Sequence, residues 1–149
     1  MKPAAQGELS LELATLILQA ALEKARSLGV LVNIAVVDAG PNLKAFSRMD
    51  GALRGTIDVA MRKARTAGLF EMETGTMGES SQPGAPWYGI ERSNGGLITF
   101  PGGVPLKSPA GETIGAIGVS GSSVENDRAV AMAGAAMVAS HLARFPANH

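Results

Sequence analysis

The sequence predicts an α+β fold in which helices cover a mainly antiparallel sheet. Apolar residues recur at helical spacing near the start, the middle and the end of the chain. Between these segments lie short runs of β-branched or alternating residues, separated by the turn residues typical of β-hairpins. Hairpins produce antiparallel neighbours, and helices must cover the apolar face of such a sheet.

The first helix is expected to begin after Ser10, whose hydroxyl can cap a helix N-terminus, and to end near Leu28, just before Gly29. Residues 32–38 are rich in β-branched side chains, and residues 43–49 alternate with a period of two. Both runs are predicted to be strands, and the Gly-Pro-Asn turn between them indicates a hairpin.

A second helix is predicted between residues 53 and 70, where apolar residues again follow a helical period. Residues 71–96 show no sustained period, and they contain the one tryptophan and the one tyrosine of the chain, Trp87 and Tyr88. Long irregular segments in compact domains are usually functional or disordered. Because exposed large aromatic side chains often mark a contact surface, we expect this pair at a subunit contact or over the mouth of a pocket.

Three short strands and a last helix complete the predicted domain. The strands are expected at residues 97–100, 104–107 and 113–120. The second of them contains Pro105, which favours an edge position in the sheet. Ser122 and Glu125 have the spacing of a capping box, so a helix is expected to begin there and to continue to about Arg144.

Length and composition limit the class of protein. A chain of 149 residues is typical of one domain, which we place at residues 10–145 between tails at 1–9 and 146–149. The formal net charge is 0, without the basic excess expected of a nucleic-acid binder. No apolar run approaches the roughly 18 residues of a membrane span, and the first residues lack the apolar stretch of a signal peptide. We therefore expect a cytoplasmic protein with no nucleic-acid or membrane partner.

Few residues are suited to common catalytic or metal chemistry. The chain has no cysteine, and its two histidines, His141 and His149, lie in the last helix or after it. A Ser-His-Asp or Cys-His arrangement is therefore not expected. Carboxylates such as Asp50, Glu71 and Glu73 lack the spacing of a known metal loop, and no metal site is predicted.

The most informative polar cluster lies where the second strand meets the second helix. Arg48 at this junction can combine with the N–H groups of a helix start to bind an anion, or it can pair locally with Asp50. Lys63 lies near the apolar side of the second helix, so an inward orientation of its side chain is one alternative. A partly buried lysine can anchor an anion or act as a base or nucleophile, but a lysine stem can also pass an apolar face with its ammonium solvated. The sequence leaves these alternatives open.

Five segments occur in the order found in one protein family. They are IAVVDAG (34–40), SRMDGA (47–52), KARTA (63–67), PGGVPL (101–106) and GAIGVSG (115–121). On these segments the chain resembles the GlcG/HbpS family of haem-binding or haem-degrading proteins, which also includes the C-terminal domain of PduO-type proteins. The resemblance extends from about Ser10 to Leu142.

This resemblance implies an α/β/α-layered domain of profilin-like appearance, with about five antiparallel strands. It also implies assembly into dimers or larger rings, in agreement with the 24 alanines and 19 glycines of the chain. Haem is the cofactor that the family suggests, but no histidine lies in the body of this domain. The remaining candidates for an axial ligand are a threonine hydroxyl and the following side chains: Met49, Met61, Met72, Met77 and Tyr88.

The function expected from these observations is the binding of a small organic acid or related metabolite by a homo-oligomer, as a companion of a catabolic pathway. The predicted pocket lies at a subunit edge and is formed by Arg48, Asp50, Lys63, Thr66, Trp87, Tyr88, Pro101, Gly102 and Gly103. Haem binding is one alternative. Isomerase or lyase chemistry on a small acid, with Lys63 or Asp50 as the base, is another, so the sequence leaves open whether the protein is an enzyme.

Overall fold

The computed structural model describes residues 8–144, and most of both predicted tails, including His149, lies outside this range. Its centre is a sheet of four antiparallel strands in the order β2-β1-β4-β3. These strands are β1 (Asn33–Asp38), β2 (Leu43–Arg48), β3 (Gly103–Lys107) and β4 (Thr113–Ser120). The α+β class is confirmed, with four strands where about five were expected.

The predicted strand at residues 97–100 does not form. The amide of Ile98 donates to the hydroxyl of Thr66 at 3.1 Å, and the amide of Leu97 donates to the carbonyl of Glu91 at 2.9 Å. These partners lie on helix α2 and in the short 3₁₀ helix at Ile90–Arg92, so residues 97–100 have no neighbouring strand. The sequence showed the β-branched composition but not these hydrogen-bond partners.

Three helices cover one face of the sheet: α1 (Leu11–Leu28), α4 (Val124–Ala135) and α5 (Met137–Arg144). The predicted caps of α1 are confirmed, because Ser10 accepts a hydrogen bond from Leu13 and Gly29 adopts a left-handed conformation. The last helix differs from the prediction in two ways. Its N-cap is Ser123 rather than Ser122, and it is divided at Ala136 into α4 and α5.

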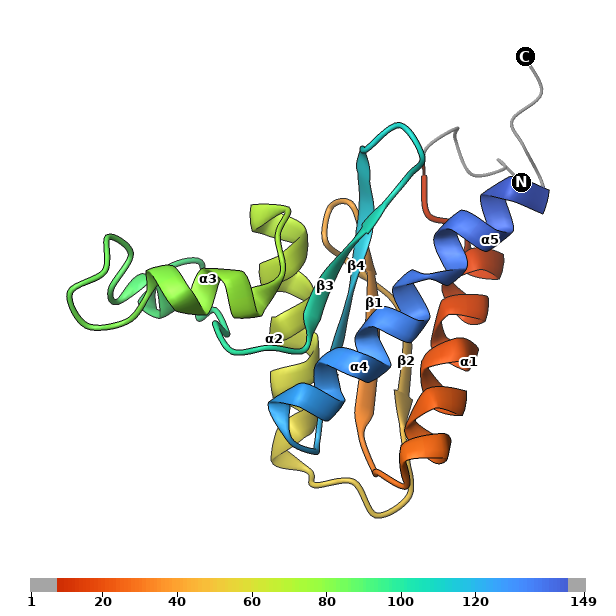
Figure 1. Ribbon diagram of the computed structural model, residues 1–149, viewed down its shortest axis with the longest axis horizontal. Coiled ribbons are helices and arrows are strands. Elements are labelled where there is room, and N and C mark those ends of the chain that lie inside the picture. The colour runs from red at the N-terminus through yellow and green to blue at the C-terminus, as the bar shows by residue number, and fades with distance from the viewer. Residues whose placement is uncertain (1–7, 145–149) are drawn as a thin grey trace.

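Helix α2 (Gly55–Phe70) covers the opposite face, so the domain has the expected α/β/α layers (Figure 1). Small residues allow this helix to lie close to the sheet. A Cβ atom added to Gly118 of β4 would collide with the carbonyl oxygen of Ala60 and the backbone of Ala64 in α2. The side chains between helix and sheet are therefore mostly alanines, such as Ala35, Ala67 and Ala116.

Residues 71–96 contain one helix that their composition did not predict, α3 (Thr74–Ser80). They also form a short 3₁₀ helix at Ile90–Arg92. In Figure 1 this segment, in green, projects away from the sheet and the other helices. An ion pair between Arg128 of α4 and Glu73, with an N–O distance of 2.7 Å, connects its base to the domain. No helix within residues 8–144 has the length and apolar character needed to cross a bilayer.

Candidate functional site

The structure distributes the predicted site residues over several places. Arg48 and Asp50 line one surface hollow. Lys63, Gly102 and Gly103 meet in the interior, beside the N-terminal end of β3. The candidates are therefore described below as separate groups.

The first group forms a hollow of about 230 Å³ between the end of β2 and the start of α2. We call it the Arg48–Arg54 hollow, and its lining residues are Arg48, Met49, Asp50, Gly51, Ala52 and Arg54. The chain turns here through Gly51, which has a φ of 83°. A Cβ atom at this position would lie 3.0 Å from Leu31, so glycine suits both the conformation and the space.

The charged side chains of this hollow are not paired with one another or with other described residues. The side chains of Arg48, Asp50 and Arg54 take part in none of the hydrogen bonds or ion pairs within residues 8–144. The local Arg48–Asp50 pair, one of the two alternatives from the sequence, is thus not formed. Two guanidinium groups and one carboxylate give a net positive charge beside the first turn of α2, where the helix dipole also favours an anion.

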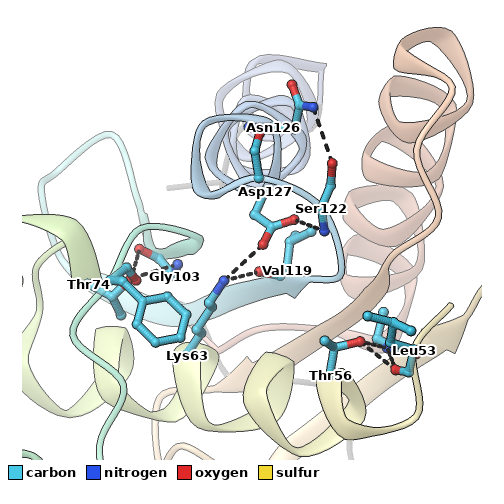
Figure 2. A network of polar contacts seen from close by, with 12 residues as sticks. Leu53, Thr56, Lys63, Thr74, Gly103, Val119, Ser122, Asn126 and Asp127 are labelled. Atoms are coloured by element: carbon cyan, nitrogen blue, oxygen red, sulfur yellow. Dashed lines mark hydrogen bonds and ion pairs between the residues drawn. The ribbon is translucent and has the colours of Figure 1, made fainter.

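The second group centres on Lys63, whose side chain is completely buried. As Figure 2 shows, it extends from α2 toward the first turns of α4. Its Nζ lies 3.1 Å from Oδ2 of Asp127 and donates to the carbonyl oxygen of Val119 at 2.8 Å. The ring of Phe100 covers the ammonium at 4.9 Å from its centroid. Lys63 therefore points inward, which is one of the alternatives that the sequence left open, and its ammonium is not solvated.

The backbone around Pro101 explains why a lysine reaches this position. Strand β3 begins only after Gly102. The Gly102 carbonyl accepts from the amide of Val119, but the Val119 carbonyl accepts from the ammonium of Lys63 instead of from a backbone amide of β3. A Cβ atom on Gly102 would lie 2.6 Å from the Lys63 ammonium. The hydroxyl of Thr74 fixes the turn, because it accepts from the Gly103 amide and donates to the Phe100 carbonyl.

Burial determines the electrostatics of this pair. Desolvation lowers the pKa of Lys63, and the charge of Asp127 only partly offsets this effect. Desolvation likewise raises the pKa of Asp127, against the attraction of Lys63 and the hydrogen bond from the Ser122 amide. Each charge therefore depends on the other to remain ionised. Lys63 is out of contact with solvent, and its ammonium connects α2 to α4 through Asp127. It therefore offers no free amine to a ligand in this conformation.

The other predicted residues have separate surroundings. Thr66 is buried, accepts from Ile98 and donates to the Arg62 carbonyl, so it supports the loop beside α2. Trp87 is 38% exposed and its ring centroid lies 6.2 Å from that of Phe70. Tyr88 is 69% exposed. Neither aromatic residue lines the Arg48–Arg54 hollow.

Sequence reasoning missed a second hollow of about 310 Å³, lined by Asp58, Met61, Arg62, Arg65, Asn94 and Gly95. The Arg62 guanidinium donates to the carboxylate of Asp58 and to the carbonyls of Gly95 and Gly96. Arg62 and Arg65, three residues apart on one helix, could have indicated a basic surface from the sequence. The sequence could not show that Asn94 and Gly95 complete the hollow. Within residues 8–144, no group of three or more acidic or histidine side chains is placed to hold a metal ion.

The fold and these hollows define a layered α+β domain with a small arginine-lined site at one end of its sheet. The family described as "Haem degrading protein HbpS-like" matches residues 9–136. The chain belongs to this family of haem-binding or haem-degrading type, and the resemblance to GlcG/HbpS proteins is confirmed.

Three similar proteins illustrate the relationship. A 15.0 kDa protein from the dhaT-dhaS intergenic region of Citrobacter freundii is 40% identical over 114 residues, which cover 76% of this chain and 80% of that protein. Protein GlcG of Escherichia coli K12 is 37% identical over 112 residues, covering 75% and 81%. A crystal structure of a PduOC:heme complex is 36% identical with a TM-score of 0.83, covering 88% of this chain and 95% of that one.

Proposed function

We propose that this protein binds a small organic anion in the Arg48–Arg54 hollow. The observation that carries the proposal is the presence of two guanidinium groups without a carboxylate partner at the edge of this hollow. Guanidinium groups bind carboxylates through paired, charge-assisted hydrogen bonds. The charge of the site therefore selects an anion.

The size and walls of the hollow indicate the kind of anion. A volume of about 230 Å³ accepts a small molecule. Met49 and Ala52 supply apolar wall, and the exposed side chains of Leu31 and Leu53 belong to the adjoining segments. An acid with a short carbon chain fits both the charge and these walls.

The proposal includes two wider features. We place the hollow at the edge of a homo-oligomer that accompanies a catabolic pathway. If the site also catalyses isomerisation or elimination, Asp50 is the candidate base, because it lines the hollow while Lys63 is held by Asp127 in the interior.

Calorimetric titration with propanoate and succinate tests the proposal. Replacing Arg48 or Arg54 with alanine should lower the affinity for the more tightly bound of the two acids about 10- to 100-fold, since a hydrogen bond to a charged group contributes about 1.5–3 kcal/mol. Arg65→Ala is the matched control, because it removes an arginine from the other hollow. Unchanged affinity in Arg48→Ala and Arg54→Ala, or equal loss in Arg65→Ala, would show that the site is elsewhere.

Haem is a second candidate, because the similar PduOC structure is a haem complex. Proteins hold haem iron through His, Cys, Met or Tyr side chains. Between residues 8 and 140 the chain has neither His nor Cys. The sulfur of Met49 accepts from the Val32 amide at 3.5 Å, Met77 is completely buried, and Tyr88 lines neither hollow. Met61 is exposed beside the second hollow, but a lone thioether is a weak ligand. Residues 8–140 therefore supply no histidine to a haem iron.

A further inference from the structure

Three polar residues form a row across the sheet beside the Arg48–Arg54 hollow. Asn33 of β1 is paired directly with Arg48 of β2 on one side and with Ser120 of β4 on the other. Directly paired residues of antiparallel strands point to the same face, with Cβ atoms about 4.5–5.5 Å apart. We call Arg48, Asn33 and Ser120 the cross-strand row.

The row faces α2. Ala35 and Phe46 lie two residues away from Asn33 and Arg48 along their strands, and both pack in the cluster between the sheet and α2. Gly118 lies two residues before Ser120 and touches the backbone of α2. Because side chains alternate along a strand, the members of the row share this face.

Asn33 is completely buried, and half of its amide group has no partner. Its Nδ2 donates to the hydroxyl of Thr56 at 2.8 Å and to the carbonyl of Leu53 at 3.3 Å. Its Oδ1 is the one buried side-chain polar atom within residues 8–144 that has no hydrogen bond. Exchanging the nitrogen and oxygen would direct the oxygen at the Leu53 carbonyl, so the observed orientation is fixed.

The hydroxyl of Ser120, on the opposite side of Asn33 from Arg48, makes no hydrogen bond to the described residues. The residue is 4% exposed, and its oxygen, unlike Oδ1 of Asn33, still reaches solvent. The row thus combines a cation, an acceptor without a donor, and a free hydroxyl. Buried polar groups are normally satisfied, and a group without a partner requires an explanation such as a bound molecule.

We infer that the anion bound in the hollow is a hydroxy carboxylic acid, an inference that rests on the function proposed above. Its carboxylate binds Arg48 and Arg54, and its hydroxyl donates to Oδ1 of Asn33 and accepts from Ser120. A neutral hydroxyl suits this position better than an ammonium, because burying a charge costs far more than burying a hydroxyl that is hydrogen-bonded. Asn33 is completely buried and its amide donates to the Leu53 carbonyl, while the Leu53 side chain is exposed, so the inference requires the surface loop at residues 49–53 to move when the acid binds.

Calorimetry with lactate, 3-hydroxypropanoate and propanoate tests the inference, since these acids share a carboxylate and three carbons and differ in the hydroxyl. The better of the two hydroxy acids should bind at least tenfold more tightly than propanoate. Ser120→Ala should remove this preference while leaving propanoate affinity unchanged, and Asn33→Ala should remove the preference as well. Ser120→Ala decides the question if Asn33→Ala does not fold, because Ser120 holds no other group in place.

Equal binding of all three acids to the wild-type protein, with loss of binding in Arg48→Ala, would overturn the inference and leave the proposed function intact. A preference for hydroxy acids that survives in Ser120→Ala would also overturn it. If neither these acids nor other small carboxylates bind at all, the proposed function fails, and the inference fails with it.

Discussion

Replacing Lys63 with methionine is the perturbation whose effect the structure defines best. Methionine retains most of the apolar stem and its contact with Phe100, but it removes the ammonium from a site that is closed to solvent. Asp127 then keeps only its interactions with backbone amides, chiefly the hydrogen bond from the Ser122 amide, and the Val119 carbonyl loses its donor. The substitution therefore isolates a buried carboxylate without creating a large cavity.

The expected cost is about 3–5 kcal/mol, which is typical when one partner of a buried ion pair is removed. In a domain of about this size, 1 kcal/mol shifts the melting temperature by about 2–4 °C, so Tm should fall by about 6–20 °C. The double variant Lys63→Met/Asp127→Leu contains no isolated charge. It leaves two backbone groups without partners, and it should cost about 2–4 kcal/mol, far below the sum of the two single variants.

Urea unfolding of the wild type, both single variants and the double variant gives the coupling energy between Lys63 and Asp127. The reasoning would be refuted by a cost below 1 kcal/mol for Lys63→Met, or by a double variant whose cost equals the sum of the singles. Lys44→Met, on the half-buried middle of β2, is a suitable control because its ammonium has no partner among the described residues.

Three further predictions follow from the same structure. In Asp127→Asn, Lys63 loses the carboxylate that raises its pKa, so its pKa falls further below 10.5. Between that lowered pKa and 10.5 the unfolded chain binds more protons than the folded chain, so the folded variant gains stability relative to the wild type as pH rises through this window. Urea unfolding at several pH values should therefore show that the difference in stability between variant and wild type decreases. A constant or growing difference would contradict this prediction. Trp87→Ala should weaken self-association by on the order of 2–3 kcal/mol in sedimentation experiments, and the indole emission of the wild type should shift to the red on dilution; an emission already typical of a solvated indole in the assembly would contradict this. Titration with hemin should give no saturable Soret shift at a ratio of one to one, whereas a tight six-coordinate spectrum would show that the chain supplies axial ligands after all.

Local features of the fold were accessible from the sequence because they depend on neighbouring residues. The caps of α1 at Ser10 and Gly29 and the β1–β2 hairpin are of this kind. Residues 97–100 were misassigned because their backbone amides bond to Thr66 of α2 and to Glu91 of the short 3₁₀ helix rather than to a strand. The local pattern carries no information about such partners.

The candidate site was only partly accessible for the same reason. The charge pattern around Arg48 pointed to residues that line the hollow, but the position of Lys63 on the apolar side of α2 left open whether its ammonium is buried or solvated. Asp127 resembled an ordinary acidic residue in the first turn of a helix, and Asn33 an ordinary polar residue at a strand end. Lys63 also lies about two helical turns beyond the start of α2, too far from Arg48 to share one small pocket.

The central claim is that the Arg48–Arg54 hollow binds a small carboxylate. Amide ¹⁵N–¹H spectra recorded during a titration with sodium lactate, with sodium chloride at equal ionic strength as the reference, test it most directly. The account predicts saturable shifts concentrated at residues 48–56 and extending to Asn33 and Ser120. Shifts concentrated at residues 58–65 and 94–96, or no saturable shift anywhere, would contradict it.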